Sequence, residues 1–381
     1  MGALHAATAR AQQPAAAAEL PPLAWKPSTS SPGPAQAADA RTKALLAACG
    51  TPDAALAAVA QRNVDRQLAG MGLFPSDELA FTLRAAGDPH VWPRAWSVSG
   101  PQLGEDDLLK RVTTWAGNSR AQGARRCGLA RGVGADGTHV TAAIAVDVLA
   151  DLSPLPTTAR VGQWLNLEGT MLVPATAAKV VLLGPRGAPR TVVASLSGNR
   201  VRSSFAVDQP GPWLVQVLAT VSTGPRPVLE AAVFAGVTPP GAYVRAAAPG
   251  EGAAQGVSDD GEAMRRMINA ARATEGLPAL VRDVELEKLA LEHSEEMKRN
   301  KMVGHDVGGG DPRARIEAAG IKARLAGENV ASASSLQGAH RALWSSPSHR
   351  GNLLGERWTR VGVAVVRGAD GFVWVTELFA G

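Results

Sequence analysis

The stretches Ala326-Gly327-Glu328-Asn329-Val330-Ala331 and Trp344-Ser345-Ser346-Pro347-Ser348-His349-Arg350 decide how this chain is interpreted. Together with His305 upstream, they supply two imidazoles and one carboxylate from three separated segments near the carboxyl end. Such a set can line one cleft, bind a divalent metal or carry out acid–base chemistry. The functional argument therefore rests on roughly the last third of the sequence.

The residues around these stretches alternate between helical spacing and breakers, and the chain then ends in apolar runs. Asp259 opens one helix, which Gly276-Leu277-Pro278 ends, and Asp311-Pro312 opens another with proline at its first position. Helices are predicted at about 259–275, 283–300, 311–319 and 335–344, and strands at 361–366 and 372–379. The pattern predicts an α+β domain over residues 257–381, with the last helix ended by Pro347.

The motifs of this region, in their order, resemble those of the CAP superfamily, the cysteine-rich secretory and pathogenesis-related group, in its short bacterial (SCP-like) form. The segments that carry the resemblance are 289–297, Gly304-His305, 315–320, 326–331, 344–354, 361–363 and 374–379. The resemblance covers about 257–381. It implies an α-β-α sandwich and, in most members, export from the cell.

In that family, two His and one or two Glu line a central cleft and can hold a divalent metal. By motif, His305, Glu328 and His349 are the residues that the resemblance assigns to this set, with zinc as the first expectation. The further acidic residue of the eukaryotic pattern is absent from Trp344-Ser345-Ser346-Pro347. At most three strong ligands remain, which with one water is the set of a catalytic zinc site.

Three interpretations of the cleft, which is predicted to include Asn329 and Ser346, stay open. It binds a ligand or a metal, it forms a buried hydrogen-bonded network that fixes the fold, or it hydrolyses a substrate through metal-bound water. A Ser346–His349 nucleophile pair is the weaker alternative to a loop brace, because neither an oxyanion donor nor an orienting acid is evident.

The other histidines of the chain are expected to be structural rather than functional. His293 falls on the apolar face of its predicted helix, and His340 lies one helical turn before Trp344. His90 and His139 are isolated in the sequence. We expect His293 to be a core histidine with a satisfied ring and His340 to be a packing or rim residue rather than a ligand.

The length of the whole chain, 381 residues, predicts two or three domains. Residues 1–40 read as a disordered Ala/Pro-rich lead, in which Ala9-Arg10-Ala11 is either the remnant of an export signal or part of an ordinary tail. Residues 41–152 predict a small α+β domain, 155–237 an all-β sandwich of immunoglobulin-like type, and 238–256 a flexible linker.

The N-terminal α+β domain is interpreted in two ways. Its turn Gly134-Ala135-Asp136-Gly137 repeats as Gly368-Ala369-Asp370-Gly371 when 127–137 is laid on 361–371 without gaps. Either residues 45–150 are a degenerate copy of the CAP-like domain that has lost its His and Glu residues, or two hairpins share one favourable turn.

Charge, hydropathy and cysteine content exclude some function classes. The net charge of +5 is spread along the chain without a basic stripe, so nucleic acid is not expected as a partner. No run of 18 apolar residues exists, so no membrane span is expected. Cys49 and Cys127 pair if the protein is exported and stay as buried thiols in a reducing compartment.

The sequence therefore predicts an exported protein, in the cell envelope or outside the cell, that binds a ligand through its His/Glu cleft. The expected ligand is a cell-wall polymer, a lipid or a protein. The alternative is a metal-dependent hydrolase of peptide or cell-wall substrate.

Overall fold

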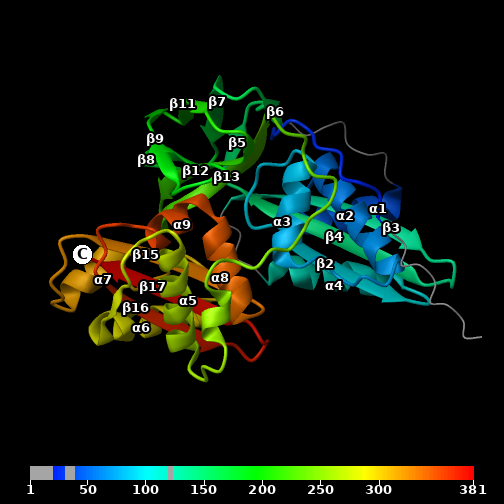
Figure 1. Ribbon diagram of the computed structural model, residues 1–381. Helices are drawn as coiled ribbons and strands as arrows, with labels where there is room; N and C mark the ends of the chain where they lie inside the picture. Colours follow the sequence, from blue (N-terminus) through cyan, green and yellow to red (C-terminus); the bar gives the residue numbers. More distant parts are fainter. Residues whose placement is uncertain (1–19, 31–38, 119–122) are drawn as a thin grey trace, which may run out of the picture.

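Residues 20–30, 39–118 and 123–381 are described by the computed structural model. Figure 1 shows an N-terminal α+β unit in blue and cyan, two green sheets, and a C-terminal α+β domain in yellow to red. None of the helices in these ranges is long and apolar enough to cross a membrane. The predicted export-signal remnant at residues 9–11 falls outside the described residues.

The C-terminal domain is built on one four-stranded sheet. Its strands are β14 (Val281–Arg282), β15 (Ala326–Ala333), β16 (Arg360–Arg367) and β17 (Val373–Ala380), in the order β14-β16-β17-β15. Its helices are η1 (Glu251–Ala254), α5 (Asp260–Thr274), α6 (Val284–Asn300), α7 (Pro312–Ala318), α8 (Leu336–Ser345) and α9 (Pro347–Leu353). The sheet is mixed, with β14 parallel to β16 and the other pairs antiparallel.

Helices cover both faces of this sheet, which agrees with the predicted α-β-α sandwich. Met264 and Met267 of α5 share one core cluster with Val361 and Phe379 of the sheet. On the opposite face, Leu286 of α6 belongs to a separate apolar cluster around the sheet. The helix starts predicted from aspartates are also present, because Asp259 and Asp283 accept hydrogen bonds from first-turn backbone N–H groups.

Two elements near the site differ from the prediction. Glu328 and Asn329 lie in β15, an edge strand that the sequence analysis did not assign. Pro347, expected only to end a helix, also begins the new helix α9. Proline is tolerated there because the first N–H groups of a helix have no intrahelical partner. Both elements carry predicted site residues, so the correction bears directly on the site.

The N-terminal unit follows the element order of the C-terminal domain, without counterparts of η1 and α9 among the described residues. Its elements are α1 (Ala40–Cys49), β1 (Thr51–Pro52), α2 (Ala54–Leu68), α3 (Ser76–Ala85), β2 (Arg94–Gly100), α4 (Glu105–Gly117), β3 (Ala124–Val133) and β4 (His139–Val148). Their sheet order β1-β3-β4-β2, with β1 parallel to β3, matches β14-β16-β17-β15 strand for strand. Cys49 and Cys127 form a disulfide that joins α1 to β3.

One glycine serves the same purpose in each unit. A Cβ atom at Gly128 would lie 2.0 Å from Ala57 N of α2, and one at Gly362 would lie 2.2 Å from Glu287 N of α6. No real side chain tolerates such a distance, so only glycine lets the helix approach the strand this closely. The two units therefore share a packing detail as well as an order of strands.

Two sheets packed face to face form the middle of the chain. One contains β5 (Ala150–Leu152), β7 (Gln163–Met171), β10 (Ala194–Ser197) and β11 (Arg200–Val207), in the order β10-β11-β7-β5. The other contains β6 (Thr158–Ala159), β8 (Ala177–Leu183), β9 (Arg190–Val192), β12 (Gly211–Val221) and β13 (Gly224–Ala235), in the order β6-β13-β12-β8-β9. Side chains of both sheets share one apolar cluster, so this part is a β-sandwich; its immunoglobulin-like topology stays a prediction.

Part of the lead predicted to be disordered is packed, which corrects that prediction for residues 20–30. The Trp25 ring lies edge-on to Phe81, 5.2 Å away between centroids, and to Phe234, 4.7 Å away. Ser28 pairs with Leu155 in a β-bridge. An aromatic side chain held by two others contributes enough burial to order a short extended segment. Residues 1–19 and 31–38 of the lead fall outside the described residues.

The linker at 238–256 is held at both ends rather than free. Tyr243 and Arg245 both donate to the carboxylate of Asp77 in α3, at 2.8 and 3.0 Å. Further along, Glu251 accepts two hydrogen bonds from the guanidinium of Arg341 in α8. These contacts connect the N-terminal unit to the C-terminal domain.

Candidate functional site

The site is centred on Glu328, whose side chain is 1% exposed. Its Oε1 accepts a hydrogen bond of 2.8 Å from His305 Nδ1, and its Oε2 accepts one of 2.7 Å from Arg315 Nη2. A buried carboxylate is costly unless it is paired and hydrogen-bonded. Both of its oxygens are paired here, so the carboxylate is fixed in one orientation.

His305 lies in the loop after α6 and presents the more accessible face of the network, with a side chain that is 16% exposed. Because Glu328 Oε1 can only accept from it, His305 Nδ1 carries the ring hydrogen in the neutral form. Its Nε2 then keeps a lone pair. The buried carboxylate thus sets both the orientation and the tautomer of His305, an arrangement that suits an imidazole offered to a ligand.

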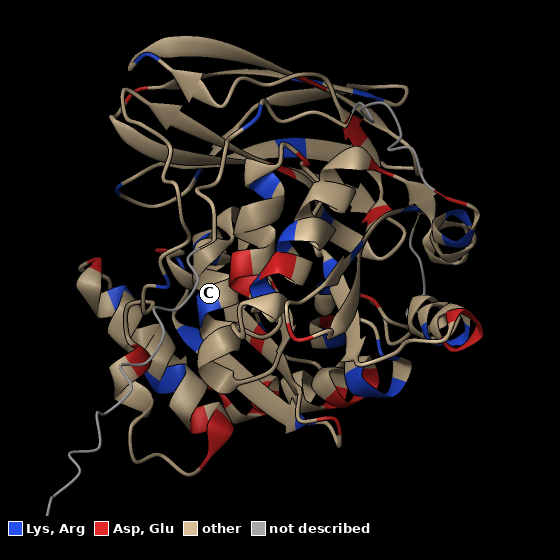
Figure 2. Ribbon diagram, turned by 90° about the vertical axis from the view of Figure 1, so that its right-hand side faces the viewer, with Lys and Arg blue, Asp and Glu red and all other residues tan. Residues whose placement is uncertain are grey.

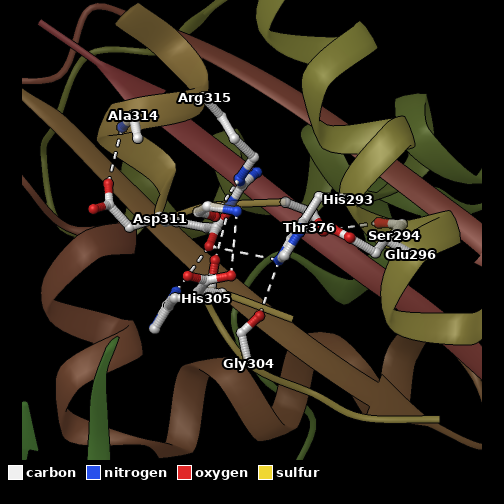
Figure 3. A network of polar contacts seen from close by, with 12 residues as sticks. His293, Ser294, Glu296, Gly304, His305, Asp311, Ala314, Arg315 and Thr376 are labelled. Atoms are coloured by element: carbon white, nitrogen blue, oxygen red, sulfur yellow. Dashed lines mark hydrogen bonds and ion pairs between the residues drawn. The ribbon is translucent and has the colours of Figure 1, made fainter. Parts of the chain in front are cut away.

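Arg315 and His293 complete the network from α7 and α6. Arg315 Nη2 also donates to the carbonyl of His305, at 3.1 Å, which fixes the loop as well as the carboxylate. His293 Nε2 donates to the carbonyl of Gly304, at 2.9 Å, and lies 3.9 Å from Glu328 Oε1. Burial lowers the pKa of His293, so its ring stays neutral. In Figure 3, His293, His305 and Arg315 point toward one another from these three segments.

Asn329, the next residue of β15, points to the opposite face of the sheet and supports α9. Its Nδ2 donates to the carbonyl of His349, at 3.1 Å, and to Glu377 Oε2 of β17, at 2.9 Å. Its Oδ1 accepts from Asn352 Nδ2 at 2.9 Å. The predicted cleft residue Asn329 therefore contacts the His349 backbone through its side chain.

His349 lies on α9 beyond the edge formed by β15. Burial lowers the pKa of its imidazole to about 3, and the charge of nearby His305 adds to this effect. The ring is therefore neutral throughout the physiological range. No hydrogen bond between the imidazole of His349 and Glu328 is present among residues 20–30, 39–118 and 123–381. The structure thus joins His305 and Glu328 directly, while His349 is near His305 and is bonded through its carbonyl to Asn329.

Ser346 contacts the β-sandwich rather than an imidazole. Its Oγ accepts a hydrogen bond of 3.3 Å from Gln216 Nε2 of β12, and the next turn is held by Gln216 Oε1, which accepts from Ser348 N at 3.1 Å. Gln216 Nε2 also donates to Glu230 of β13, at 2.9 Å, and Glu230 pairs with Arg84 of α3 at 2.6 Å. A continuous polar chain therefore runs from the N-terminal unit through the sandwich to α9.

The turn between β12 and β13 also lies against His305. Asp306 N donates to the carbonyl of Thr223, at 3.4 Å, and a Cβ atom at Gly224 would lie 3.3 Å from His305 Cβ. A ligand that reaches His305 therefore approaches it beside the sandwich. The site belongs to two parts of the molecule, which the sequence analysis did not anticipate.

The arrangement does not present the three-ligand metal set in a ready form. Among the described residues, no group of three or more His, Cys, Asp and Glu side chains is placed to hold a metal ion. Glu328 gives its oxygens to Arg315 and His305, and a guanidinium beside a carboxylate opposes a second cation. The assignment of zinc to His305, Glu328 and His349 stays a prediction: His305 Nε2 keeps its lone pair, whereas Glu328 would have to give up a hydrogen bond from His305 or Arg315 before it could coordinate a metal.

The remaining histidines are where the sequence analysis expected structural residues. His340 is fully buried and its Nε2 donates to the carbonyl of Pro249, at 2.8 Å. His90 is buried against Asp88, with 2.8 Å between Nδ1 and Oδ1. His139 is exposed on β4. The prediction that His293 is a buried core residue with a bonded ring holds for Nε2, but its Nδ1 has no partner among the described residues.

Two residues of the site were missed at the sequence level. Arg315 was noted only as part of a motif, although its guanidinium neutralises Glu328. Glu377 was likewise noted only within a motif, yet it is fully buried, and burial raises its pKa to about 8. The signal for Glu377 is a lone carboxylate in the otherwise uncharged stretch 373–380.

Comparisons with known proteins were made for the whole chain. Residues 265–379 match the model of the cysteine-rich secretory protein family, CAP. The search of curated proteins gave no match.

Solved structures similar to the chain come from bacteria. An outer surface protein of Borrelia burgdorferi is 26% identical, with 32% of this chain and 91% of that protein covered and a TM-score of 0.31. An extracellular protein containing an SCP domain from Bacillus anthracis is 18% identical, with 60% and 87% covered and a TM-score of 0.30. A cysteine-rich secretory protein from Staphylococcus aureus is 8% identical, with 61% and 83% covered and a TM-score of 0.28.

Proposed function

Since residues 265–379 form a CAP domain, we propose that this protein is exported and binds a ligand at the cell envelope or outside the cell. The ligand is a cell-wall polymer, a lipid or a protein. Its site comprises His305, Glu328, Asn329, Ser346 and His349, together with the β12–β13 turn of the sandwich beside them.

The observation that carries this proposal is the fixed imidazole of His305. Glu328 holds Nδ1, Arg315 holds the carbonyl of the same residue, and Nε2 is left with a lone pair. A polar group whose orientation is fixed before binding costs less entropy when a ligand arrives. The free lone pair of His305 Nε2 favours a ligand-binding role for the network. In a purely structural network, no residue would need an unused lone pair near solvent.

The contacts favour binding over hydrolysis by a serine nucleophile. Ser346 Oγ is engaged by Gln216, and Ser348 Oγ is buried without a partner among the described residues. A nucleophilic serine needs a base within hydrogen-bond reach. The metal-dependent hydrolase stays the alternative, and its test is the metal measurement below.

The distribution of charged residues does not favour binding to nucleic acid or to a membrane surface. In the view of Figure 2, Lys and Arg alternate with Asp and Glu along the helices of the α+β parts, and the sandwich carries few charges. Recognition in the site is therefore expected to rest on directed hydrogen bonds rather than on a broad electrostatic field.

We also infer that the N-terminal unit is a CAP copy that has lost this site. If Gly128 is equated with Gly362, the strand registers become comparable. In the N-terminal unit, Ile144 of β4 pairs with Ala95 on one side and with Gly128 on the other. In the C-terminal domain, Leu378 of β17 pairs in the same way with Glu328 and Gly362. Alanine thus stands in the place of Glu328, and by the same register Ala143 stands in the place of Glu377. Ligand binding is assigned to the C-terminal domain for this reason.

His305→Ala is expected to weaken ligand binding at least tenfold, because it removes the oriented lone pair without emptying the core. The full chain is to be tested by sedimentation with purified peptidoglycan and by flotation with vesicles of phosphatidylglycerol and phosphatidylethanolamine. His139→Ala is the matched control, since His139 is exposed and remote from the site. Retention by His305→Ala equal to that of the parent chain would contradict the assignment.

The same variants test the metal. Calorimetric titration of chelator-treated protein with zinc is expected to show weak binding, because both oxygens of Glu328 are already engaged by His305 and Arg315, which leaves only two imidazoles as ligands. Binding is expected to vanish in a chain carrying both His305→Ala and His349→Ala. Zinc binding that survives in the double variant would refute the predicted ligand set, and tight binding coupled to peptide or wall hydrolysis would favour the hydrolase.

A further inference from the structure

A cavity lies on the outer side of the C-terminal domain, between α6 and α7. Its volume is about 720 Å³, and we call it the α6–α7 groove. His293, Glu296 and Arg315 line its polar part, and Ala314, Ala318 and Ala319 line its α7 side. His305, Glu328 and His349 are not among its lining residues, although His293 and Arg315 line it and also contact Glu328.

His293 lines this groove and carries a buried acceptor that is unused among the described residues. The side chain is fully buried, its Nε2 hydrogen is given to the Gly304 carbonyl, and Nδ1 has no hydrogen-bond partner among the described residues. Because the ring is neutral and Nε2 is the donor, Nδ1 carries a lone pair. An acceptor buried without a partner destabilises the folded protein. A ligand with a hydrogen-bond donor would satisfy Nδ1 at this point.

Glu296 adds a second acceptor beside the first. Its Oε2 lies 3.6 Å from His293 Nδ1, beyond hydrogen-bond distance, and neither atom carries a hydrogen when the carboxylate is ionised. A Cβ atom at Gly309 would lie 2.7 Å from Glu296 Oε2, so a larger residue there would displace the end of the Glu296 side chain. Two adjacent acceptors require a ligand with one or two donors between them.

Arg315 supplies the complementary donor. Its side chain is 10% exposed, and its Nη1 is buried without a hydrogen-bond partner among the described residues, while Nη2 and Nε are engaged. Figure 3 shows the Arg315 guanidinium, His293 and Glu296 in the same network. The groove thus offers one donor close to two acceptors.

The charges around the groove oppose a strongly charged ligand. Its three acidic lining residues are matched in number by three basic ones, namely Glu285, Glu292 and Glu296 by Lys288, Arg299 and Arg315. An anion would meet the rim carboxylates and Glu296, and a cation would meet the guanidinium. A neutral group that both donates and accepts, such as a hydroxyl, satisfies all three unpartnered positions.

We propose that the α6–α7 groove binds a neutral polyhydroxylated ligand, a sugar of one or two rings. Neighbouring hydroxyls donate to His293 Nδ1 and Glu296 and accept from Arg315 Nη1. The apolar face of the ring lies on the small side chains of Ala314, Ala318 and Ala319, which leave room for it. A volume of about 720 Å³ is within the range of small-molecule sites.

Saturation-transfer NMR on the full chain tests this inference with cellobiose, maltose and lactose as probes. Ala318→Trp is expected to fill the groove and to reduce the disaccharide signal at least fivefold, because Ala318 lies exposed on α7 and its replacement leaves the core intact. Ala342→Trp, at an exposed position of α8, is the matched control and is expected to change nothing. Addition of the disaccharide is also expected to shift the Nδ1 resonance of His293.

Each other outcome would overturn the inference. No signal from any disaccharide, or a signal that survives Ala318→Trp, shows that the groove is not a sugar site. Binding of acetate or methylammonium in place of the disaccharides shows that charge, not hydroxyl geometry, decides. A disaccharide signal lost in His305→Ala would place the sugar at the other site. Because His305 does not line the groove, a negative result for the sugar site does not contradict ligand binding at His305. A negative result for His305 does not contradict the sugar site either.

Discussion

Glu377→Gln is expected to stabilise the protein at pH 8.5 and to change its stability little at pH 5. Glu377 is fully buried, and its one hydrogen bond, of 2.9 Å, comes from Asn329. Its Oε1 has no partner among the described residues. Burial raises the pKa of this carboxyl from 4.5 to about 8, so the folded protein keeps a proton that the unfolded chain releases.

The sign of the effect follows from this difference in bound protons. Between pH 4.5 and about 8 the folded state binds more protons at Glu377 than the unfolded state does. Stability from this group is therefore fully present below pH 4.5 and is lost as the pH rises, by about 1.4 kcal/mol per pH unit. Glutamine keeps the shape and the acceptor for Asn329, but it cannot ionise, so the loss on the order of 4 kcal/mol disappears.

Urea unfolding of the parent chain and of Glu377→Gln at a series of pH values measures the difference. Glu317→Gln, on an exposed carboxylate of α7, is the matched control and is expected to leave the pH dependence as in the parent. A difference between Glu377→Gln and the parent that is constant from pH 5 to 8.5 would show that Glu377 ionises normally in the folded protein.

Arg315→Met is expected to cost about 3–5 kcal/mol in the free energy of unfolding at pH 7. The side chain is 10% exposed, and its loss leaves the carboxylate of Glu328 buried with only His305 as a partner. Removing one member of a buried pair is far more costly than removing both, because an uncompensated charge remains. The double variant Arg315→Met, Glu328→Gln is therefore expected to recover part of the lost stability.

Arg313→Met is the control on the same helix. Arg313 is 81% exposed and pairs with Glu317 across one turn, and such pairs contribute about 0.3–0.5 kcal/mol. Thermal or urea unfolding of the four chains gives the comparison. If Arg315→Met is no more destabilising than Arg313→Met, or if Glu328→Gln adds to its cost instead of offsetting it, Glu328 does not depend on Arg315.

Local signals in the sequence were sufficient for most helices of the C-terminal domain. Asp259 and Asp283 cap the helices that they were predicted to start, and the apolar spacing of Met264 and Met267 places them in the core. Strand β15 was not predicted because Gly327, Glu328 and Asn329 show no alternation of apolar residues. That strand is defined by pairing with β17, a contact between residues far apart in the chain.

The candidate site was predicted in part for the same reason. Motif resemblance placed His305 and Glu328 together, and their direct hydrogen bond agrees with this. It carried no information on Arg315 as the counter-ion or on Gln216 of the sandwich, since both depend on how separate segments pack. The proposed metal ligands His305, Glu328 and His349 remain a prediction. The motif could not show that Glu328 is hydrogen-bonded to Arg315 and His305, because these contacts also depend on how separate segments pack.

The identity of the ring nitrogen that carries hydrogen in His305 tests the central claim most directly. In the full chain with ¹⁵N-labelled histidine, assigned by comparison with His305→Asn, the account predicts a protonated Nδ1 with a downfield hydrogen-bonded proton. It also predicts that Glu328→Ala, which removes the acceptor, abolishes this signal. A His305 ring with its hydrogen on Nε2, or a spectrum that Glu328→Ala leaves unchanged, would contradict the claim that Glu328 orients His305 for a ligand.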